Sequence, residues 1–340
     1  MSQTPTVDAG RATPGWLAWG ALGVVYVVWG STYLAIRFVV ESMPPLLSGG
    51  IRFVLAGLVL MVAVLFFTRG RGLRMNRRQL GSAVLIGLLL PAWGNGMVVI
   101  AEQHVASGLA ALLVASVPLY VVVLRRLLGE RPPAITLVGV AIGLAGLALL
   151  LLGGPVAGAH GSAGWGPWLV LLAALGWSIG SVASTRLPVP ANPFALSAVE
   201  MVAGGTAMTV IGLITGERMR LGEFTTASWL SWIYLILFGS LLAFSSYVFV
   251  LGKLPVSTVA TYAYVNPVIA VVLGVLFAGE HFGFAQLAGG LVVLAAVLVV
   301  VRAERAPKPE PPCGEMSVPA PNQLREPSHQ EDPSRLGGRR

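Results

Sequence analysis

Charged residues are scarce in this chain. Only 11% of its 340 residues are charged, whereas a soluble domain usually has about 25%. Only two residues are lysines, Lys253 and Lys308, and neither follows a glycine-rich loop. A P-loop is therefore absent, and we expect no ATPase activity of its own. None of the four histidines is paired at metal-ligand spacing. The sequence thus favours neither a metalloprotease nor a Ser-His protease, and it predicts no enzyme, no cofactor and no metal site.

Cysteine is almost absent as well. The one cysteine, Cys313, excludes an intrachain disulfide and says nothing about the redox compartment. It lies in a segment, 303–340, that is rich in Pro, Glu, Arg and Ser and has little to bury. We expect this segment to be a disordered cytoplasmic tail, and residues 1–16 to be a cytoplasmic N-terminal segment.

Apolar runs dominate what remains. Hydrophobic residues make up 56% of the chain, and the mean hydropathy is +0.81. Runs of about 18–24 residues can cross a hydrocarbon core of about 30 Å. The sequence predicts ten such spans in one bundle of an all-α integral membrane protein, at about 17–38, 45–67, 80–101, 107–124, 134–153, 165–184, 193–215, 229–251, 257–278 and 282–302.

The net charge of +8 is distributed unevenly between the two sets of loops. With the N-terminus inside, the outer loops hold only Arg218 and Arg220, while the inner loops hold Arg69, Arg71, Arg74, Arg77, Arg78, Arg125, Arg126, Arg131, Arg186 and Lys253. This bias predicts that both termini are cytoplasmic, and it explains the basic balance without a nucleic-acid partner.

The chain also repeats itself. At a shift of 148 residues, Trp29 aligns with Trp177, Pro45 with Pro193 and Gly57 with Gly205. The halves, 17–153 and 154–302, each hold five predicted spans, so they must cross the membrane in opposite orientations. Inverted repeats of this kind favour alternating access, with a site near the midplane between the halves.

Three stretches match a known family in residues and in order, namely "WGSTYLAIRFVVESMPPLLSGGIRF", "GNGMVVIAE" and "ATYAYVNPVIAVVLG". The chain resembles the drug/metabolite transporter superfamily, in its EamA-type ten-helix family, and within it the inner-membrane drug/metabolite exporter subgroup. The resemblance covers about residues 17–302. It implies a basket-shaped bundle with a central cavity that exports small metabolites, amino acids or drugs across the bacterial inner (plasma) membrane. The alternative is a membrane sensor or scaffold built on a carrier fold.

Polar residues open the ninth predicted span. Thr258, Tyr262 and Asn266 are four apart and share one helix face, and Pro267 removes a backbone hydrogen bond beside them. A freed carbonyl is tolerated in lipid only against protein or a wet cavity. We expect this face to line a cavity, although the same residues could serve only to join helices.

The first span carries an aromatic face. Tyr26, Trp29, Tyr33 and Arg37 are spaced three, four and four apart. Trp29 and Tyr33 could form a wall for a planar or cationic solute, or could only pack between helices. Trp177, the repeat mate of Trp29, carries the same two alternatives. We expect the Arg37 head to reach the membrane interface.

The third span is interrupted by proline and glycine in "LLLPAWGNGMVV". Such broken segments indicate the binding site in inverted-repeat transporters, although a kink could only shape the bundle. The break and its counterpart at a shift of 150 residues add four candidates for the cavity lining, Trp93, Asn95, Ser245 and Tyr247.

Two charges lie deep in predicted spans. Arg52 and Glu200 each follow the proline of a span by seven residues and are repeat mates of opposite sign. A charge at such depth costs at least about 2.5–3.5 kcal/mol, so each should face a cavity or a partner. Glu200 could carry a proton, or both could be structural, and the sequence leaves proton coupling, substrate and oligomeric state open.

Three further carboxylates fall in loops or at helix ends. Glu102 marks an outer helix end, beside His104, where we expect solvation. Glu130 and Glu280 follow glycines at the ends of spans four and nine, and we expect them to cap or brace short loops.

Overall fold

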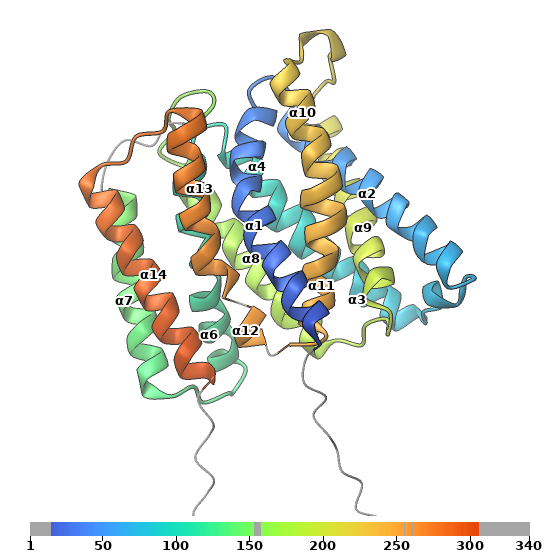
Figure 1. The fold of residues 1–340 in the computed structure, drawn as a ribbon, viewed down its shortest axis with the longest axis horizontal. Coiled ribbons are helices and arrows are strands. Elements are labelled where there is room, and N and C mark those ends of the chain that lie inside the picture. The colour runs from blue at the N-terminus through green and yellow to red at the C-terminus, as the bar shows by residue number, and fades with distance from the viewer. Residues whose placement is uncertain (1–14, 153–157, 255, 260, 306–340) are drawn as a thin grey trace, which may run out of the picture. The chain divides into compact units, whose positions relative to one another are not determined.

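The computed structural model describes residues 15–152, 158–254, 256–259 and 261–305. The first fourteen residues and the part of the predicted tail beyond residue 305 lie outside it. The described elements are helices α1 (Trp16–Val39), α2 (Pro45–Phe67), η1 (Arg71–Leu73), α3 (Arg77–Gly87), η2 (Leu88–Asn95), α4 (Gly96–Ala101), α5 (Ser107–Val114), α6 (Val117–Leu127), α7 (Ala134–Leu152), α8 (Gly166–Arg186), α9 (Pro193–Ile214), η3 (Leu221–Glu223), α10 (Thr226–Tyr234), η4 (Leu235–Phe244), α11 (Ser245–Leu251), α12 (Val256–Val259), α13 (Tyr262–Ala278) and α14 (Phe284–Arg305) (Figure 1).

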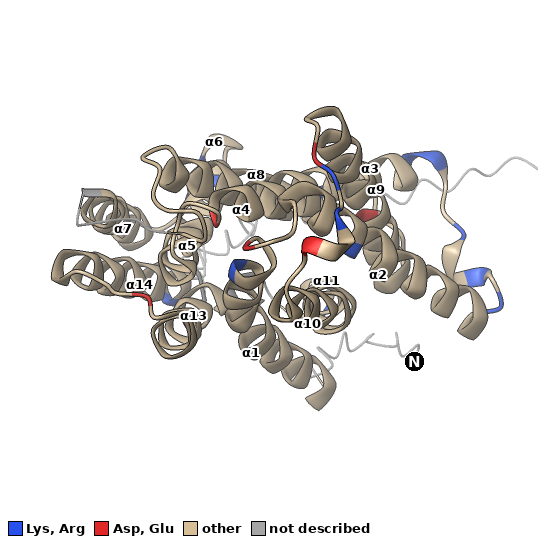
Figure 2. Ribbon diagram, turned by 90° about the horizontal axis from the view of Figure 1, so that it is seen from above, with Lys and Arg blue, Asp and Glu red and all other residues tan. Residues whose placement is uncertain are grey.

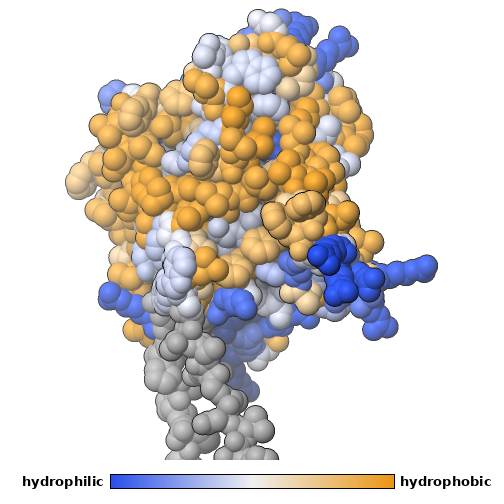
Figure 3. All heavy atoms as spheres, turned by 45° about the vertical axis from the view of Figure 1, so that its right-hand side comes forward, coloured by the Kyte–Doolittle hydropathy of each residue, from blue (hydrophilic) through white to orange (hydrophobic). Residues whose placement is uncertain are grey.

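These helices confirm the ten predicted spans. Within the described ranges, nine helical stretches are long and apolar enough to cross a membrane, and the shorter apolar helix α13 supplies most of the remaining span. An apolar belt crosses the face shown in Figure 3, with hydrophilic residues at its margins. From above, charged residues fall mainly on loops and helix ends (Figure 2). The fold is therefore an all-α bundle suited to a lipid bilayer.

Helices that are repeat mates pack on each other. α2 packs along α9, and α7 packs along α14. The pair α7 and α14 forms one edge of the bundle (Figure 1). α1 packs against α13, and its mate α8 packs against α5 and α6 in the same way. The pairing of helices thus has the approximate two-fold symmetry that a duplicated sequence predicts.

Glycine permits the closest of these contacts. A Cβ added at Gly205 on α9 would lie 2.7 Å from the backbone oxygen of Gly50 on α2. No side chain larger than hydrogen fits there without moving a backbone, and small residues at helix crossings allow such close packing in membranes.

Four spans are irregular, and they form two pairs of mates. The third and eighth spans contain the π-helical segments η2 and η4, and only η2 contains a proline, Pro91. The fourth span breaks between α5 and α6, and the ninth between α12 and α13. Pro267 does not break its helix, because α13 begins at Tyr262 and is continuous through Pro267. These interruptions gather near the middle of the bundle.

The two Gly-Glu turns begin alike and end differently. Gly129 and Gly279 both have positive φ, 90° and 59°, which glycine adopts without steric cost. After Gly279, the Glu280 carboxylate accepts hydrogen bonds from the N–H groups of Ser107 and Gly108, at 2.7 and 3.0 Å. It therefore satisfies donors at the start of α5. Glu130 instead forms exposed ion pairs with Arg125 and Arg186.

Candidate functional site: a central aromatic cavity

A cavity lies between the two halves of the bundle. It holds about 680 Å³ of space between atoms, counting the part open to solvent. Its lining comes from seven of the ten spans and consists of Trp29, Thr32, Tyr33, Ile36, Arg52, Phe53, Gly94, Asn95, Val98, Val114, Ala173, Ala174, Trp177, Gly239, Phe244, Tyr262 and Asn266.

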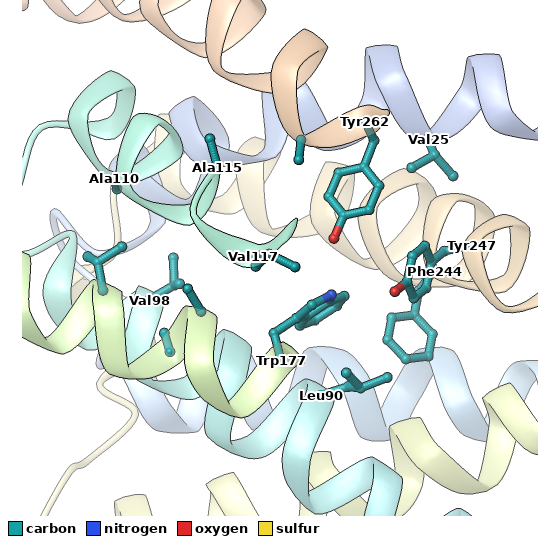
Figure 4. Close-up of a cluster of buried hydrophobic side chains, with 14 of the residues drawn as sticks. Val25, Leu90, Val98, Ala110, Ala115, Val117, Trp177, Phe244, Tyr247 and Tyr262 are labelled. Carbon is teal, nitrogen blue, oxygen red and sulfur yellow. The ribbon is translucent and has the colours of Figure 1, made fainter. Parts of the chain in front are cut away.

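One wall of the cavity belongs to an aromatic cluster of four rings, of which Trp29, Trp177 and Tyr262 line the cavity. The Trp29 ring lies 5.4 Å from Trp177, 4.8 Å from Tyr247 and 5.4 Å from Tyr262, centroid to centroid. Its contacts with Trp177 and Tyr262 are nearly perpendicular, at 82° and 85°. Edge-to-face contacts of this kind hold rings at fixed angles, and the electron-rich face of an aromatic ring attracts a cation. In Figure 4, the hydroxyl groups of Tyr262 and Tyr247 point towards Trp177.

The irregular spans position these rings. The Trp29 indole Nε1 donates to the backbone oxygen of Gly239 in η4, at 3.3 Å. A Cβ added at Gly94 in η2 would lie 2.8 Å from the Trp177 ring. Each π-helical segment therefore places a glycine beside one of the two mate tryptophans, Gly239 in η4 beside Trp29 and Gly94 in η2 beside Trp177. The absence of a glycine side chain lets each indole ring pack against the backbone.

Polar groups line the cavity away from the indole rings. Arg52, 4% exposed, donates through Nη2 to the Oδ1 atom of Asn95 at 3.0 Å, and its guanidinium lies 4.4 Å from the centre of the Phe53 ring. Asn266 sits where its amide nitrogen can donate to the backbone oxygens of Tyr26 and Tyr262, at 3.0 and 3.3 Å. The cavity thus combines a cation, two amides and an aromatic wall.

Sequence reasoning found part of this lining. The structure places Trp29, Tyr33, Asn95, Trp177, Tyr262, Asn266 and Arg52 around the cavity, and their role in binding stays a prediction. The lining residues that sequence reasoning missed lie three or four positions along the same helices from residues that it identified. Thr32 and Ile36 continue the Trp29 face, Val98 follows Asn95 by three, and Ala173 precedes Trp177 by four.

Four candidates lie outside the lining. Trp93 is 39% exposed and donates to the backbone oxygen of Leu172 at 2.8 Å, so it faces away from the cavity. Ser245 and Glu200 are buried beside the cavity rather than on its wall. Tyr247 lies behind Trp29 and bonds Ser181 at 3.0 Å. No ion pair joins Glu200 to Arg52 among the described residues.

One expectation about charges is wrong, and one stays a prediction. The Nε and Nη1 atoms of Arg37 are buried and meet no hydrogen-bond partner in the described part of the chain, but the residue as a whole is half-buried, and the contact of its head with the interface stays a prediction. Glu102 is not solvated, because it is 0% exposed and both its carboxylate oxygens are likewise without a partner there. Burial raises the pKa of the Glu102 carboxyl well above its ordinary value, and the charge of Glu280 raises it further, whereas Arg37 and Arg52 oppose this.

A duplicated ten-span bundle with a cavity between its halves is the architecture of a secondary membrane transporter. Comparison with known sequences agrees, because the profile of the EamA-like transporter family matches this chain twice, over residues 16–152 and 164–302. The chain belongs to the EamA-like transporter family.

Several relatives extend over most of its length. The chain is 42% identical over 284 residues to the uncharacterized inner membrane transporter YedA of Escherichia coli K12, covering 83% of this chain and 90% of that one. It is 27% identical over 291 residues to a probable terminal-alkyne amino-acid exporter of Streptantibioticus cattleyicolor, covering 83% and 92%. A solved crystal structure shares the fold with a TM-score of 0.61 at 21% identity, covering 87% of this chain and all of the other.

Proposed function

We propose that this transporter exports a small amphiphilic solute across a bacterial inner membrane by alternating access, with both termini in the cytoplasm. The observation that carries the proposal is the aromatic cavity between the repeats. Its four-ring cluster suits a flat or positively charged group, while Asn95 and Asn266 suit a polar one. The name of the Streptantibioticus relative, an amino-acid exporter, supports a solute of metabolite size.

Flux into or out of liposomes tests this proposal. The purified chain is reconstituted with a panel of amino acids, their analogues and small aromatic cations, with and without a pH gradient. We expect flux of at least one solute, and we expect Tyr262→Phe and Asn266→Ala to lower it at unchanged protein content in the membrane. An equal loss of flux and protein would assign both residues a folding role only.

A sensor or scaffold on the same fold would bind solute without moving it. Binding to the purified chain, with no flux of the bound solute in liposomes, would support that alternative and contradict export.

A further inference from the structure

Two charged side chains with buried polar atoms, Arg37 and Glu102, lie close to the cavity but outside its lining. Arg37 follows Tyr33 by four residues on α1, and Glu102 follows Val98 by four at the end of α4. Ile36 and Val98 line the cavity, so Arg37 directly follows a lining residue and Glu102 lies about one helical turn, about 6 Å, beyond one. In the predicted topology both residues lie towards the outer side.

Glu102 is the carboxylate in the described ranges that has both oxygens buried without a hydrogen bond. It is 0% exposed, and neither carboxylate oxygen has a hydrogen-bond partner in the described ranges. Burying an ionised carboxylate without hydrogen bonds is costly, and a carboxyl group in such a place takes up a proton instead. A purely structural carboxylate looks different, as Glu280 shows by accepting from two backbone N–H groups.

Titratable and charged groups from three neighbouring helices act on Glu102. Arg37 and Tyr33 come from α1, Arg52 from α2 and Glu280 from the end of α13, and each interacts electrostatically with Glu102. His104 and His160 lie in the adjoining turns, but their rings are engaged elsewhere. His104 packs edge-on against Trp165, and His160 bonds the backbone oxygen of Val40 at 2.8 Å.

We propose that Glu102 is the proton-binding site that couples proton movement to solute export in this transporter. The proposal rests on the proposed export function and replaces Glu200 as the candidate carrier. Glu200 does not line the cavity, and no arginine interaction accompanies its burial, whereas Arg52, which lines the cavity, interacts electrostatically with Glu102.

The summed charge of Arg37, Arg52, Glu102 and Glu280 shows how proton binding would be coupled to solute binding. Arg37 and Arg52 supply two positive charges, and Glu102 and Glu280 supply two negative charges when both are ionised, so the sum is zero. Protonation of Glu102 makes the sum +1. A solute with a positive group would then be repelled from the adjacent cavity, so proton and solute would exclude each other. Exchange of an entering proton for a leaving cation requires this exclusion, and no covalent bond forms or breaks except the O–H bond of the carboxyl.

Proton binding can be measured without knowing the solute. Infrared difference spectra of the purified full-length protein in lipid, in H₂O and D₂O across a pH series, report buried protonated carboxyl groups. We expect a carboxylic-acid band that is present at neutral pH, is lost in Glu102→Gln and is retained in the matched control Glu200→Gln. Arg37→Gln should move its midpoint to higher pH, because a positive neighbour is gone. Identical titrations in wild type and Glu102→Gln would overturn the proposal, as would an Arg37→Gln midpoint that is unchanged or lower.

Transport separates this proposal from export itself. Wild type should drive cationic panel solutes uphill with an inward proton gradient, and Glu102→Gln should move them only downhill. Uphill flux that Glu102→Gln retains would overturn the coupling role of Glu102 and leave export standing. An intact infrared titration without flux of any panel solute would contradict export and leave the proton site standing.

Discussion

Loss of the Glu280 carboxylate should destabilise the bundle far more than loss of its repeat mate. Glu280 is 8% exposed and accepts from the N–H groups of Ser107 and Gly108, at 2.7 and 3.0 Å. Glu280→Ala leaves both donors buried without a partner, at about 1–3 kcal/mol each. The expected loss in the free energy of unfolding is therefore about 2–6 kcal/mol. Glu130→Ala removes only exposed ion pairs, worth about 0–1 kcal/mol.

Unfolding of the purified protein in one detergent, followed by circular dichroism with increasing denaturant, compares the two variants. We expect Glu130→Ala to behave nearly as wild type and Glu280→Ala to unfold at much lower denaturant. Equal effects of the two substitutions would refute the assignment of Glu280 as the cap of α5. A second variant adds a check at the same place, because a Cβ at Gly274 would lie 2.9 Å from the Glu280 Cδ atom. Gly274→Ala should therefore reproduce part of the loss.

The other predictions concern the cavity and the loops. Trp29→Ala should reduce solute flux at least about tenfold, because the Trp29 ring lines the cavity. The Trp93 ring faces away from the cavity, so Trp93→Ala should leave flux within about twofold of wild type. A larger loss in Trp93→Ala than in Trp29→Ala would contradict the assignment of the aromatic wall. Gly94→Val should displace the Trp177 ring and weaken quenching of tryptophan fluorescence by solute, while normal quenching would show that the ring adapts. Hydrogen bonding to its arginine partners lowers the pKa of Glu130, so its stabilising effect is present at neutral pH and disappears as the pH falls through that lowered value. Wild type and Glu130→Gln should then melt at the same temperature in acid, and a difference that grows in acid would refute the sign.

The spans and the repeat were predictable because hydropathy and spacing are local properties of the sequence. In the first span, the three- and four-residue spacing put Trp29 and Tyr33 on one face, and a regular helix keeps that relation in the structure. Trp93 was a candidate because it lies in the break made by Pro91 and the glycines of the third span, not because of its spacing. The third span is π-helical there, which changes the number of residues per turn and rotates the following side chains. Pro91 indicated an irregularity but not the direction in which Trp93 would turn.

Tertiary packing determines how far the charged side chains are buried, and residue spacing along the sequence does not reveal that packing. Glu102 stands at the end of a helix, where a carboxylate is normally solvated, but the 158–161 turn packs over it, with the N–H of Ala159 donating to its backbone oxygen at 3.3 Å. The Nε and Nη1 atoms of the half-buried Arg37 are likewise shielded by tertiary packing. A contact between segments about 60 residues apart leaves no local signal in either segment.

Access to the cavity from both membrane sides is the central claim, and Thr32 offers a direct test of it. Thr32 lines the cavity, and Cys313 is the one native cysteine, so Thr32→Cys in a Cys313→Ser background carries a single thiol at the site. The variant is reconstituted in one orientation, and a membrane-impermeant thiol reagent is added to either side, with and without a transported solute. We expect modification from both sides, with solute changing the ratio of the two rates. Modification from one side only, under every condition, would contradict alternating access.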